Sequence, residues 1–214
     1  MPGNNLKSNQ GSTVVITGVS RGLGRAMVEE FVRLGHTVCG CARTKDSIKV
    51  LARTHSRHDF QTVDVASDSQ VKMWADHLLS KYGPPDDVLN NAAVFAPKKC
   101  LWKMGDHHFS DEVDINLKGV VNVIRHFVPP MIFRKHGVIV NFCSRWGKKF
   151  EKEMAPYCAT KWAVVAVTRV LAEELKPECI AAIGLNPERG LQSWLSMVAQ
   201  GRNLRRRFGP KGSG

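Results

Sequence analysis

The feature that most constrains the fold is a short apolar run that leads directly into a glycine-rich turn and then into a helical pattern. The apolar run covers residues 13–17, and the turn carries Gly18, Gly22 and Gly24. Glycines at such a turn let phosphate oxygens approach the backbone, and the start of the helix offers free N–H groups and a positive dipole end. This order predicts a phosphate-binding site, whereas a glycine-rich turn without a ligand is the plain alternative.

Strand-like and helical segments alternate along the rest of the chain. The further expected strands cover 36–41, 60–65, 87–90, 138–142 and 179–185, and the expected helices cover 22–34, 45–56, 68–82, 110–128 and 156–175. The strands are continuous apolar runs, which is typical of a parallel sheet covered by helices on both faces. We therefore predict a single-domain, Rossmann-like α/β fold with a doubly wound parallel sheet, which binds ligands at the C-terminal ends of its strands.

Three local signals mark where expected helices begin and end. Gly35 is placed to cap the C-terminus of the first helix, and Ser67 or Asp68 can cap the N-terminus of the third. The pair Pro129-Pro130 is expected to end the fourth helix, because proline has no backbone N–H to donate. These helices are thus bounded by residues with a physical reason to start or stop them.

Length and composition limit the organisation of the chain. The 214 residues are 43% hydrophobic, which suits one globular domain. We expect a flexible N-terminus at 1–11, a folded domain at 12–198 and a basic, disordered tail at 199–214. No apolar run is long enough to span a bilayer, and the polar N-terminus lacks the apolar centre of a secretory signal. We therefore expect no membrane association and a cytoplasmic location.

The six cysteines and the net charge of +12 exclude more than they assign. No two cysteines form a CxxC pair, and the His and Cys spacings fit no standard metal site, so we expect reduced thiols and no metal. A basic balance can attract nucleic acid, and part of this charge is concentrated at residues 202–211. No RNA-binding or zinc-finger pattern accompanies it. We therefore expect nonspecific attraction of polyanions and no specific nucleic-acid partner.

Further motifs follow the glycine turn in a fixed order. They are TGxxxGxG at 17–24, Asp64-Val65, Asn90-Asn91-Ala92-Ala93, Asn116, Ser144, Tyr157 and Lys161. In identity and spacing these motifs resemble the short-chain dehydrogenase/reductase family, of the classical type. The resemblance extends from residue 13 to about residue 187, and it implies the same fold that the periodicity predicts.

The glycine turn and the resemblance together assign a set of cofactor-binding residues. These are Gly18, Ser20, Arg21, Gly22, Leu23, Gly24, Arg43, Asp64, Val65, Asn91, Ala92, Tyr157, Lys161 and Pro187. NAD(H) binders of this fold carry an acidic residue after the second strand, which holds the ribose 2′-hydroxyl. Here Arg43 stands at that point, and Arg21 lies within the glycine turn. Two guanidinium groups suit a 2′-phosphate, so the predicted cofactor is NADP(H).

The predicted catalytic residues are Asn116, Ser144, Tyr157 and Lys161. Tyr157 and Lys161 are four residues apart and share one helix face, so the ammonium can lower the phenol pKa from its ordinary value of about 10. The resemblance implies that Tyr157 is the acid/base, that Ser144 polarises the carbonyl, and that Asn116 positions a water supporting Lys161. The expected activity is an NADP(H)-dependent oxidoreductase acting on a small-molecule carbonyl or secondary alcohol.

The chain departs from the family pattern near its C-terminus. Ala93 replaces the last glycine of one motif, Glu188 follows Pro187 where the family has glycine, and Ser193 is a poor match for the next threonine. After about Met197 the resemblance ends, so we interpret the chain as a truncated or divergent member. A catalytically impaired NADP(H)-binding protein with a partner or sensor role is the alternative function, and a polyanion binder is a third.

Substrate walls and assembly are less constrained by the sequence. Aromatic side chains that could line an apolar pocket are Phe95, Trp146 and Phe150, with Trp102 and Trp194 as alternatives. Each of them could equally be core or loop packing. A homodimer through the helices at 110–128 and 156–175 is compatible with the resemblance.

Overall fold

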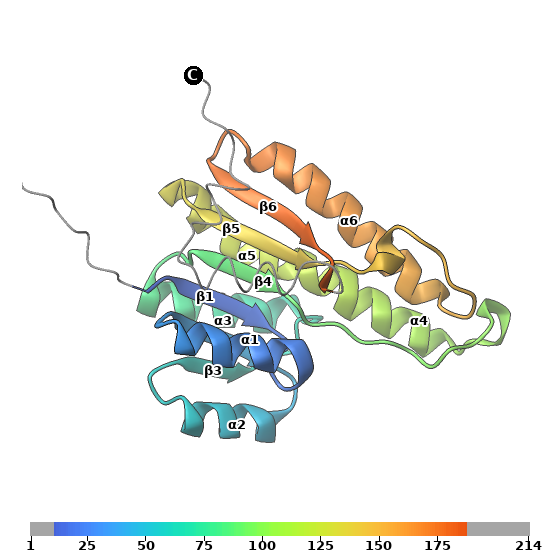
Figure 1. Cartoon of the computed structure of the whole chain (residues 1–214), viewed down its shortest axis with the longest axis horizontal. Coiled ribbons are helices and arrows are strands. Elements are labelled where there is room, and N and C mark those ends of the chain that lie inside the picture. Colours follow the sequence, from blue (N-terminus) through green and yellow to red (C-terminus); the bar gives the residue numbers. More distant parts are fainter. Residues whose placement is uncertain (1–10, 188–214) are drawn as a thin grey trace, which may run out of the picture.

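The protein is built on a sheet of six parallel strands. The computed structural model describes residues 11–187, so all but the last residue of the predicted segment 1–11, the end of the predicted domain 12–198 and the predicted tail 199–214 lie outside it. The strands are β1 (Thr13–Thr17), β2 (Thr37–Ala42), β3 (Asp59–Thr62), β4 (Asp87–Asn90), β5 (Gly137–Phe142) and β6 (Ile180–Leu185). They lie in the order β3-β2-β1-β4-β5-β6 (Figure 1). The predicted doubly wound parallel sheet is confirmed.

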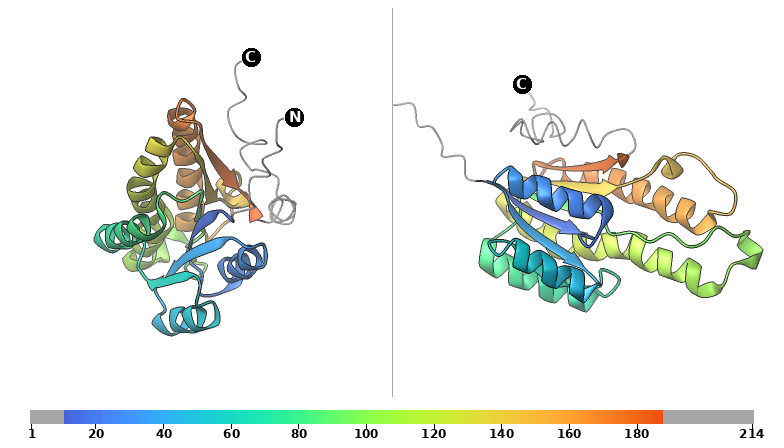
Figure 2. Two further views of the ribbon diagram at one scale, coloured as in Figure 1. Left: turned by 90° about the vertical axis from the view of Figure 1, so that its left-hand side faces the viewer. Right: turned by 60° about the horizontal axis from the view of Figure 1, so that its bottom comes forward.

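Helices cover both faces of this sheet (Figure 2). They are α1 (Gly22–Arg33), α2 (Lys45–Thr54), α3 (Asp68–Tyr82), α4 (Asp106–Glu112), α5 (Gly119–Arg134) and α6 (Ala155–Leu175). One buried apolar cluster joins the sheet to α1 and α2, through residues such as Phe31 and Leu51. A second cluster joins the opposite face to α3, α5 and α6, through Trp74, Phe127 and Leu171. Two cores therefore hold the strands in place.

The predicted caps of α1 and α3 are confirmed. Gly35 has a φ of 83°, and its N–H donates to the Val32 carbonyl at 3.0 Å, while His36 N donates to Phe31 O at 3.0 Å. Glycine is favoured there because an L side chain is strained at positive φ. At the start of α3, Ser67 Oγ accepts a hydrogen bond from Gln70 N at 3.4 Å. Local chemistry thus sets both helix ends.

The prediction of one helix at 110–128 is wrong at both ends. A π-helical stretch, Val113–Lys118, joins α4 to α5, and α5 runs on to Arg134 with Pro129 and Pro130 inside it. Each proline removes one backbone donor. However, Val128 and Met131, on either side of the pair, are buried in the core. Core packing therefore outweighs the local proline signal, as it often does for intrinsic propensity.

A buried polar chain links β4, β5 and α6. Asn90 and Asn141 are register partners, and Asn90 Nδ2 donates to Asn141 Oδ1 at 2.8 Å. Asn141 Nδ2 in turn donates to Thr168 Oγ1 on α6 at 2.9 Å. All three side chains are buried, so their mutual hydrogen bonds offset part of the cost of removing them from water.

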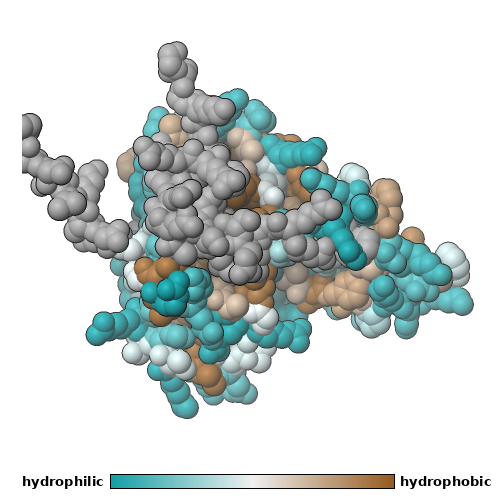
Figure 3. Space-filling view, in the orientation of Figure 1, coloured by the Kyte–Doolittle hydropathy of each residue, from teal (hydrophilic) through white to brown (hydrophobic). Residues whose placement is uncertain are grey.

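The loops that follow the strands gather at one edge of the sheet, as the parallel arrangement requires (Figure 1). Glycine-turn residue Gly18 follows β1, Arg43 follows β2, Asn91 follows β4 and Ser144 follows β5. Figure 3 shows hydrophilic residues over much of the coloured surface, with apolar residues between them. Among the described helices, none combines the length and the apolar character needed to cross a bilayer. The predicted site residues that follow the strands thus lie at one edge of the sheet.

Candidate active site

The glycine turn between β1 and α1 is shaped by close backbone approaches. Gly18 has a φ of 74°, and a Cβ placed on it would lie 2.8 Å from the Ala92 Cα. A Cβ on Gly24 would overlap the carbonyl oxygen of Gly18. Gly22 differs, because it has a φ of 57° and, apart from its neighbours along the chain, no atom of residues 11–187 lies within 4 Å of its Cβ position. Two of the glycines therefore serve packing, and the third faces open space.

Neighbouring strands hold this turn in place. Gly18 N donates to the Cys41 carbonyl at 2.8 Å. From the end of β4, Asn91 Nδ2 donates to the carbonyls of Thr17 at 2.9 Å and of Gly18 at 3.2 Å. Thr17 Oγ1 accepts from the backbone N–H groups of Asn91 and Ala92, both at 3.0 Å. The predicted cofactor residue Asn91 is thus also the side chain that fixes the shape of the turn.

A cavity of about 640 Å³ opens in front of the turn. Its lining residues are Gly18, Ser20, Arg21, Gly22, Leu23, Gly24, Cys41, Ala42, Arg43, Thr44, Ser47, Val63, Val65, Asn91, Ala92, Ala93, Val94 and Ile115. We call it the dinucleotide cavity. It brings together most of the predicted cofactor residues, from the ends of the four strands β1, β2, β3 and β4. Asp64, Tyr157, Lys161 and Pro187 are predicted cofactor residues that do not line it.

The end of the cavity beside β2 is polar and carries positive charge. Arg43 is half exposed, and its Nη1 lies 4.0 Å from Asp64 Oδ2, which places the predicted Asp64 beside the guanidinium. Thr44 and Ser47, at the start of α2, add two hydroxyl groups that we did not predict from the sequence. The signal for them was their place directly after Arg43, at the start of an expected helix. Arginine, hydroxyls and a helix start suit a phosphate.

The residues present fit a dinucleotide with an extra phosphate. A side chain at Gly22 would project into space where no described atom lies within 4 Å, so the turn leaves room for a ligand in contact with its backbone. The N-cap residue Arg21 makes no side-chain capping hydrogen bond to α1, so the first N–H groups of the helix are available to donate hydrogen bonds to phosphate oxygens. None of the described residues lining the cavity is acidic.

Tyr157 and Lys161 lie together on α6, as their spacing predicts. The Lys161 Nζ is 5.6 Å from the centroid of the Tyr157 ring. Tyr157 also contacts the predicted substrate-wall residue Phe95, edge to face, with 5.1 Å between ring centroids. Ser144 follows β5, at the same edge of the sheet. The arrangement places a phenol, a cation and a hydroxyl where the strands end.

Lys161 is buried and held by the backbone. Its Nζ donates a hydrogen bond to the Phe142 carbonyl at 2.8 Å, and its side chain is 5% exposed. Burial lowers the pKa of Lys161 to about 8, because the low-dielectric surroundings penalise the ammonium form. The cation near Tyr157 is therefore present below about pH 8 and is lost as the pH rises further.

Asn116 lies in the π-helical stretch and binds the chain that follows β4. Its Oδ1 accepts from Val94 N at 2.8 Å, and its Nδ2 donates to Val94 O at 2.9 Å. The same Nδ2 is 3.4 Å from Thr160 Oγ1 on α6. The amide thus connects the residues after β4 to the helix that carries Lys161.

Glu112 is a buried carboxyl at this site that we did not predict from the sequence. Its Oε1 accepts from Ala96 N at 2.6 Å, and its Oε2 accepts from Asn116 Nδ2 at 3.4 Å. Burial raises the pKa of Glu112, and its charge raises the pKa of Lys161, against the larger effect of burial there. The signal was its i, i+4 spacing from Asn116, which puts both on one helix face.

The remaining predicted residues either lie apart from Tyr157 and Lys161 or fall outside the residues that the structure describes. Phe150 stacks on Trp162 with 5.5 Å between ring centroids, and both Phe150 and Trp102 are largely exposed. Pro187 follows β6 and does not line the dinucleotide cavity. Glu188, Ser193 and Trp194 lie outside residues 11–187, and the side chain of Trp146 is not described. In that range all six cysteines are unpaired and no His, Cys, Asp and Glu cluster could hold a metal.

Comparison with known proteins places the chain in a family. The sequence model of the short chain dehydrogenase family matches residues 12–190. The NADPH-dependent pterin aldehyde reductase of Arabidopsis thaliana is 43% identical over 178 residues, which are 82% of this chain and 73% of that protein.

Solved structures agree with that match. A gluconate 5-dehydrogenase from Burkholderia cenocepacia, in complex with NADP and tartrate, has a TM-score of 0.78 at 29% identity, over 83% of this chain and 71% of its own. A short-chain dehydrogenase from Streptomyces avermitilis also has a TM-score of 0.78, at 27% identity, and the chain spans 65% of its length. The motifs, the strand order and these matches agree, and the chain belongs to the short chain dehydrogenase family of oxidoreductases.

Proposed function

We propose that the chain is an NADP(H)-dependent oxidoreductase that transfers a hydride between nicotinamide and a carbonyl or secondary alcohol. The observation that carries this proposal is the position of two features on one sheet edge. The dinucleotide cavity begins at the glycine turn and reaches Arg43, and the Tyr157–Lys161 pair lies beyond the adjacent strand ends. In a doubly wound sheet, this edge is where a dinucleotide and its substrate meet.

The proposed form of the cofactor rests on Arg43 and on the comparisons. Arg43, Thr44 and Ser47 would hold the 2′-phosphate, while Gly22 and the start of α1 would hold the pyrophosphate. The relative from Arabidopsis thaliana is named for NADPH, and the solved structure from Burkholderia cenocepacia contains NADP. NADPH, when bound, supplies the hydride.

Tyr157 is the proposed proton donor to the carbonyl oxygen. The nearby Lys161 ammonium would stabilise the phenolate that remains after the proton leaves, which would favour the proton transfer. The Ser144 hydroxyl would donate a hydrogen bond to the same oxygen and polarise the carbonyl. In the reverse direction, the tyrosinate accepts the proton of a secondary alcohol.

Asn116 and Glu112 are proposed to position Lys161 through their contacts with α6 and with each other. Asn116 contacts Thr160, the residue before Lys161, and Glu112 adds a buried negative charge to the same network. A carboxylate near a buried ammonium favours its charged form. The two residues would therefore maintain the cation that Tyr157 requires.

An assay of NADPH oxidation with an aldehyde panel tests the function. Pterin aldehydes are the first class to try, because the relative from Arabidopsis thaliana is named for them. Tyr157→Phe removes only the hydroxyl, so we expect kcat to fall about 10²- to 10⁴-fold, the usual contribution of an acid/base, while NADPH still binds. Tyr82→Phe is the matched control, because Tyr82 is the other tyrosine of the chain and lies beside Asp59, away from the site.

The outcome separates the oxidoreductase from the non-catalytic NADP(H)-binding alternative. Turnover that depends on Tyr157 supports the oxidoreductase. Saturable NADPH binding with no turnover of any aldehyde or alcohol would favour the non-catalytic alternative. Equal kcat values for Tyr157→Phe and the wild type would exclude Tyr157 as the acid.

Assembly and location are part of the same proposal. Exposed apolar side chains on α6, Trp162 and Val170, support a homodimer through that helix. Size-exclusion chromatography with light scattering tests it, and a monomer at all concentrations would contradict it. The six unpaired thiols support a cytoplasmic location, which cell fractionation can test.

A further inference from the structure

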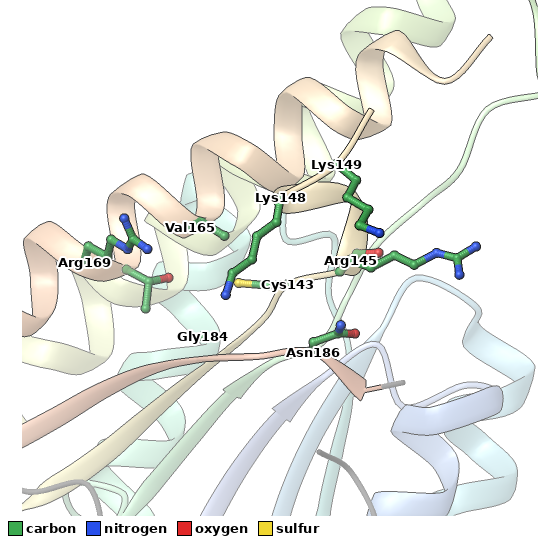
Figure 4. Close-up of a pocket in the computed structure, with 10 residues that line it drawn as sticks. Cys143, Arg145, Lys148, Lys149, Val165, Arg169, Gly184 and Asn186 are labelled. Atoms are coloured by element: carbon green, nitrogen blue, oxygen red, sulfur yellow. The ribbon is translucent and has the colours of Figure 1, made fainter. Parts of the chain in front are cut away.

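A second cavity lies beside the proposed catalytic residues, where β5 and β6 end against α6 (Figure 4). It has a volume of about 290 Å³. Its lining residues are Cys143, Ser144, Arg145, Lys148, Lys149, Val165, Thr168, Arg169, Gly184 and Asn186. We call it the cationic cavity. None of its residues lines the dinucleotide cavity, so the two spaces are distinct.

The cationic cavity has basic side chains and no described acidic one. Arg145, Lys148 and Lys149 come from the segment after β5, and Arg169 comes from α6 on the other side (Figure 4). Within residues 11–187, no carboxylate forms an ion pair with Lys148, Lys149 or Arg169. Like charges around one space repel each other, so an anion entering it would relieve that repulsion.

The cavity wall does not neutralise this charge. Lys148 points its ammonium towards the Cys143 sulfur in Figure 4. Burial raises the pKa of the Cys143 thiol, so the thiol is uncharged at neutral pH and is no counter-ion for the lysine. Val165 and Gly184 complete an apolar wall on which the non-polar part of a small molecule can rest. The cavity thus offers an apolar surface beside cations.

Ser144 belongs both to this cavity and to the proposed catalytic residues. It lines the cavity and is the residue proposed to hold the carbonyl oxygen. The geometry points to an anion subsite, in which the cationic cavity binds a carboxylate or phosphate group of the same substrate molecule whose carbonyl lies at Ser144. This inference rests on the proposed function and names its substrate class, carbonyl compounds that carry an oxyanion group.

Matched substrate pairs test the subsite. One pair is 4-carboxybenzaldehyde and its neutral analogue methyl 4-formylbenzoate, and the other is glyceraldehyde 3-phosphate and glyceraldehyde. In at least one pair, we expect kcat/KM to be about tenfold higher for the charged member, and to approach the neutral value as salt screens the lysines. The pair that responds tells whether a carboxylate or a phosphate is preferred. No preference in either pair would overturn the inference.

Charge variants show whether these lysines cause the preference. In Lys148→Gln/Lys149→Gln, the ratio of charged to neutral kcat/KM should fall well below the wild-type ratio, because two of the four cations that line the cavity are removed and the Coulomb attraction is weakened. Lys152→Gln/Lys176→Gln removes the same net charge from exposed positions that do not line the cavity, and it should keep the wild-type ratio. A ratio that survives the first variant, or falls equally in both, would contradict the subsite.

Binding without turnover keeps the subsite separate from the proposed function. If none of the four aldehydes is reduced, the oxidoreductase proposal fails, and isothermal titration with 4-carboxybenzaldehyde and its methyl ester then tests the subsite alone. Tighter binding of the carboxylate that is lost in Lys148→Gln/Lys149→Gln supports the subsite. Equal affinities, or no detectable binding of either compound, overturn it.

Discussion

The dinucleotide cavity and the catalytic end of the site share one sheet edge but are built differently. The cavity is formed largely by backbone, since the glycine turn is held by main-chain and Asn91 contacts at the ends of β1, β2 and β4. The catalytic end depends on buried side chains, with Lys161 held by the Phe142 carbonyl and Glu112 reaching Asn116. Backbone geometry follows from motif spacing, whereas a side-chain network depends on distant partners.

This difference predicts that single substitutions act in separable ways at the two regions. A change in the cavity should alter NADPH affinity with little effect on the pH profile. A change in the buried network should alter the pH profile with little effect on NADPH affinity. The three variants below test that separation, from the largest expected effect to the smallest.

Gly22→Ala should weaken NADPH binding most. The added methyl would occupy the space in front of the turn, and overpacking of this kind costs about 1–3 kcal/mol, or roughly 5- to 150-fold in Kd. Fluorescence titration of NADPH measures it. Gly35→Ala is the matched control, because Gly35 also has positive φ and no atom within 4 Å of its Cβ position, yet lies outside the cavity. If both variants weaken NADPH binding equally, the cause is backbone strain rather than the loss of contact between the glycine turn and the cofactor.

Arg43→Ala should lower affinity for NADPH about tenfold and leave NADH affinity nearly unchanged. The half-exposed guanidinium would form a charge-assisted contact to the 2′-phosphate only, and solvent screening limits its value to about 1–1.5 kcal/mol. Parallel titrations with the two cofactors give the ratio. Arg53→Ala, on α2 but not in the cavity, serves as the control. A parallel loss for both cofactors would show that Arg43 does not read the 2′-phosphate.

Glu112→Gln should shift the alkaline limb of the kcat profile towards lower pH. The carboxylate raises the pKa of Lys161, so removing its charge lets that pKa fall below about 8, and the ammonium is lost earlier as the pH rises. Kinetics from pH 6 to 10 would measure the shift. A purely structural role would lower kcat at every pH without moving the limb, and that result would contradict the electrostatic role.

The alternation of apolar strands and helices was enough to predict the fold, because period and strand character report burial directly. The glycine turn likewise predicted the cavity. Gly18 and Gly24 are required because the backbone approaches them closely, and the residues that approach belong to the sequence motifs themselves. Thr44 and Ser47 were missed because isolated hydroxyls after a strand are common. Only the fold shows that they line the same cavity as Arg43.

Long-range packing explains what sequence patterns could not give. Pro129 and Pro130 are a local stop signal, but burial of Val128 and Met131 keeps α5 helical. Glu112 reads as an ordinary helix carboxylate, and its importance comes from Ala96, which meets it only after the chain folds. The cationic cavity likewise could not be predicted from the sequence, because Arg169 on α6 lines the same space as Lys148 and Lys149 only once the chain is folded.

The amide chain from Asn90 through Asn141 to Thr168 also affects how the sheet assembles. β4 and β5 carry apolar residues that could pair in shifted alignments with similar burial. A shift of one residue would set Val140 or Phe142 opposite Asn90. The buried Asn90 amide would then lose its hydrogen-bond partner, which costs about 1–3 kcal/mol of stability. One polar pair at the ends of two apolar strands thus favours a single alignment, in which the ends of β4 and β5 lie level with each other.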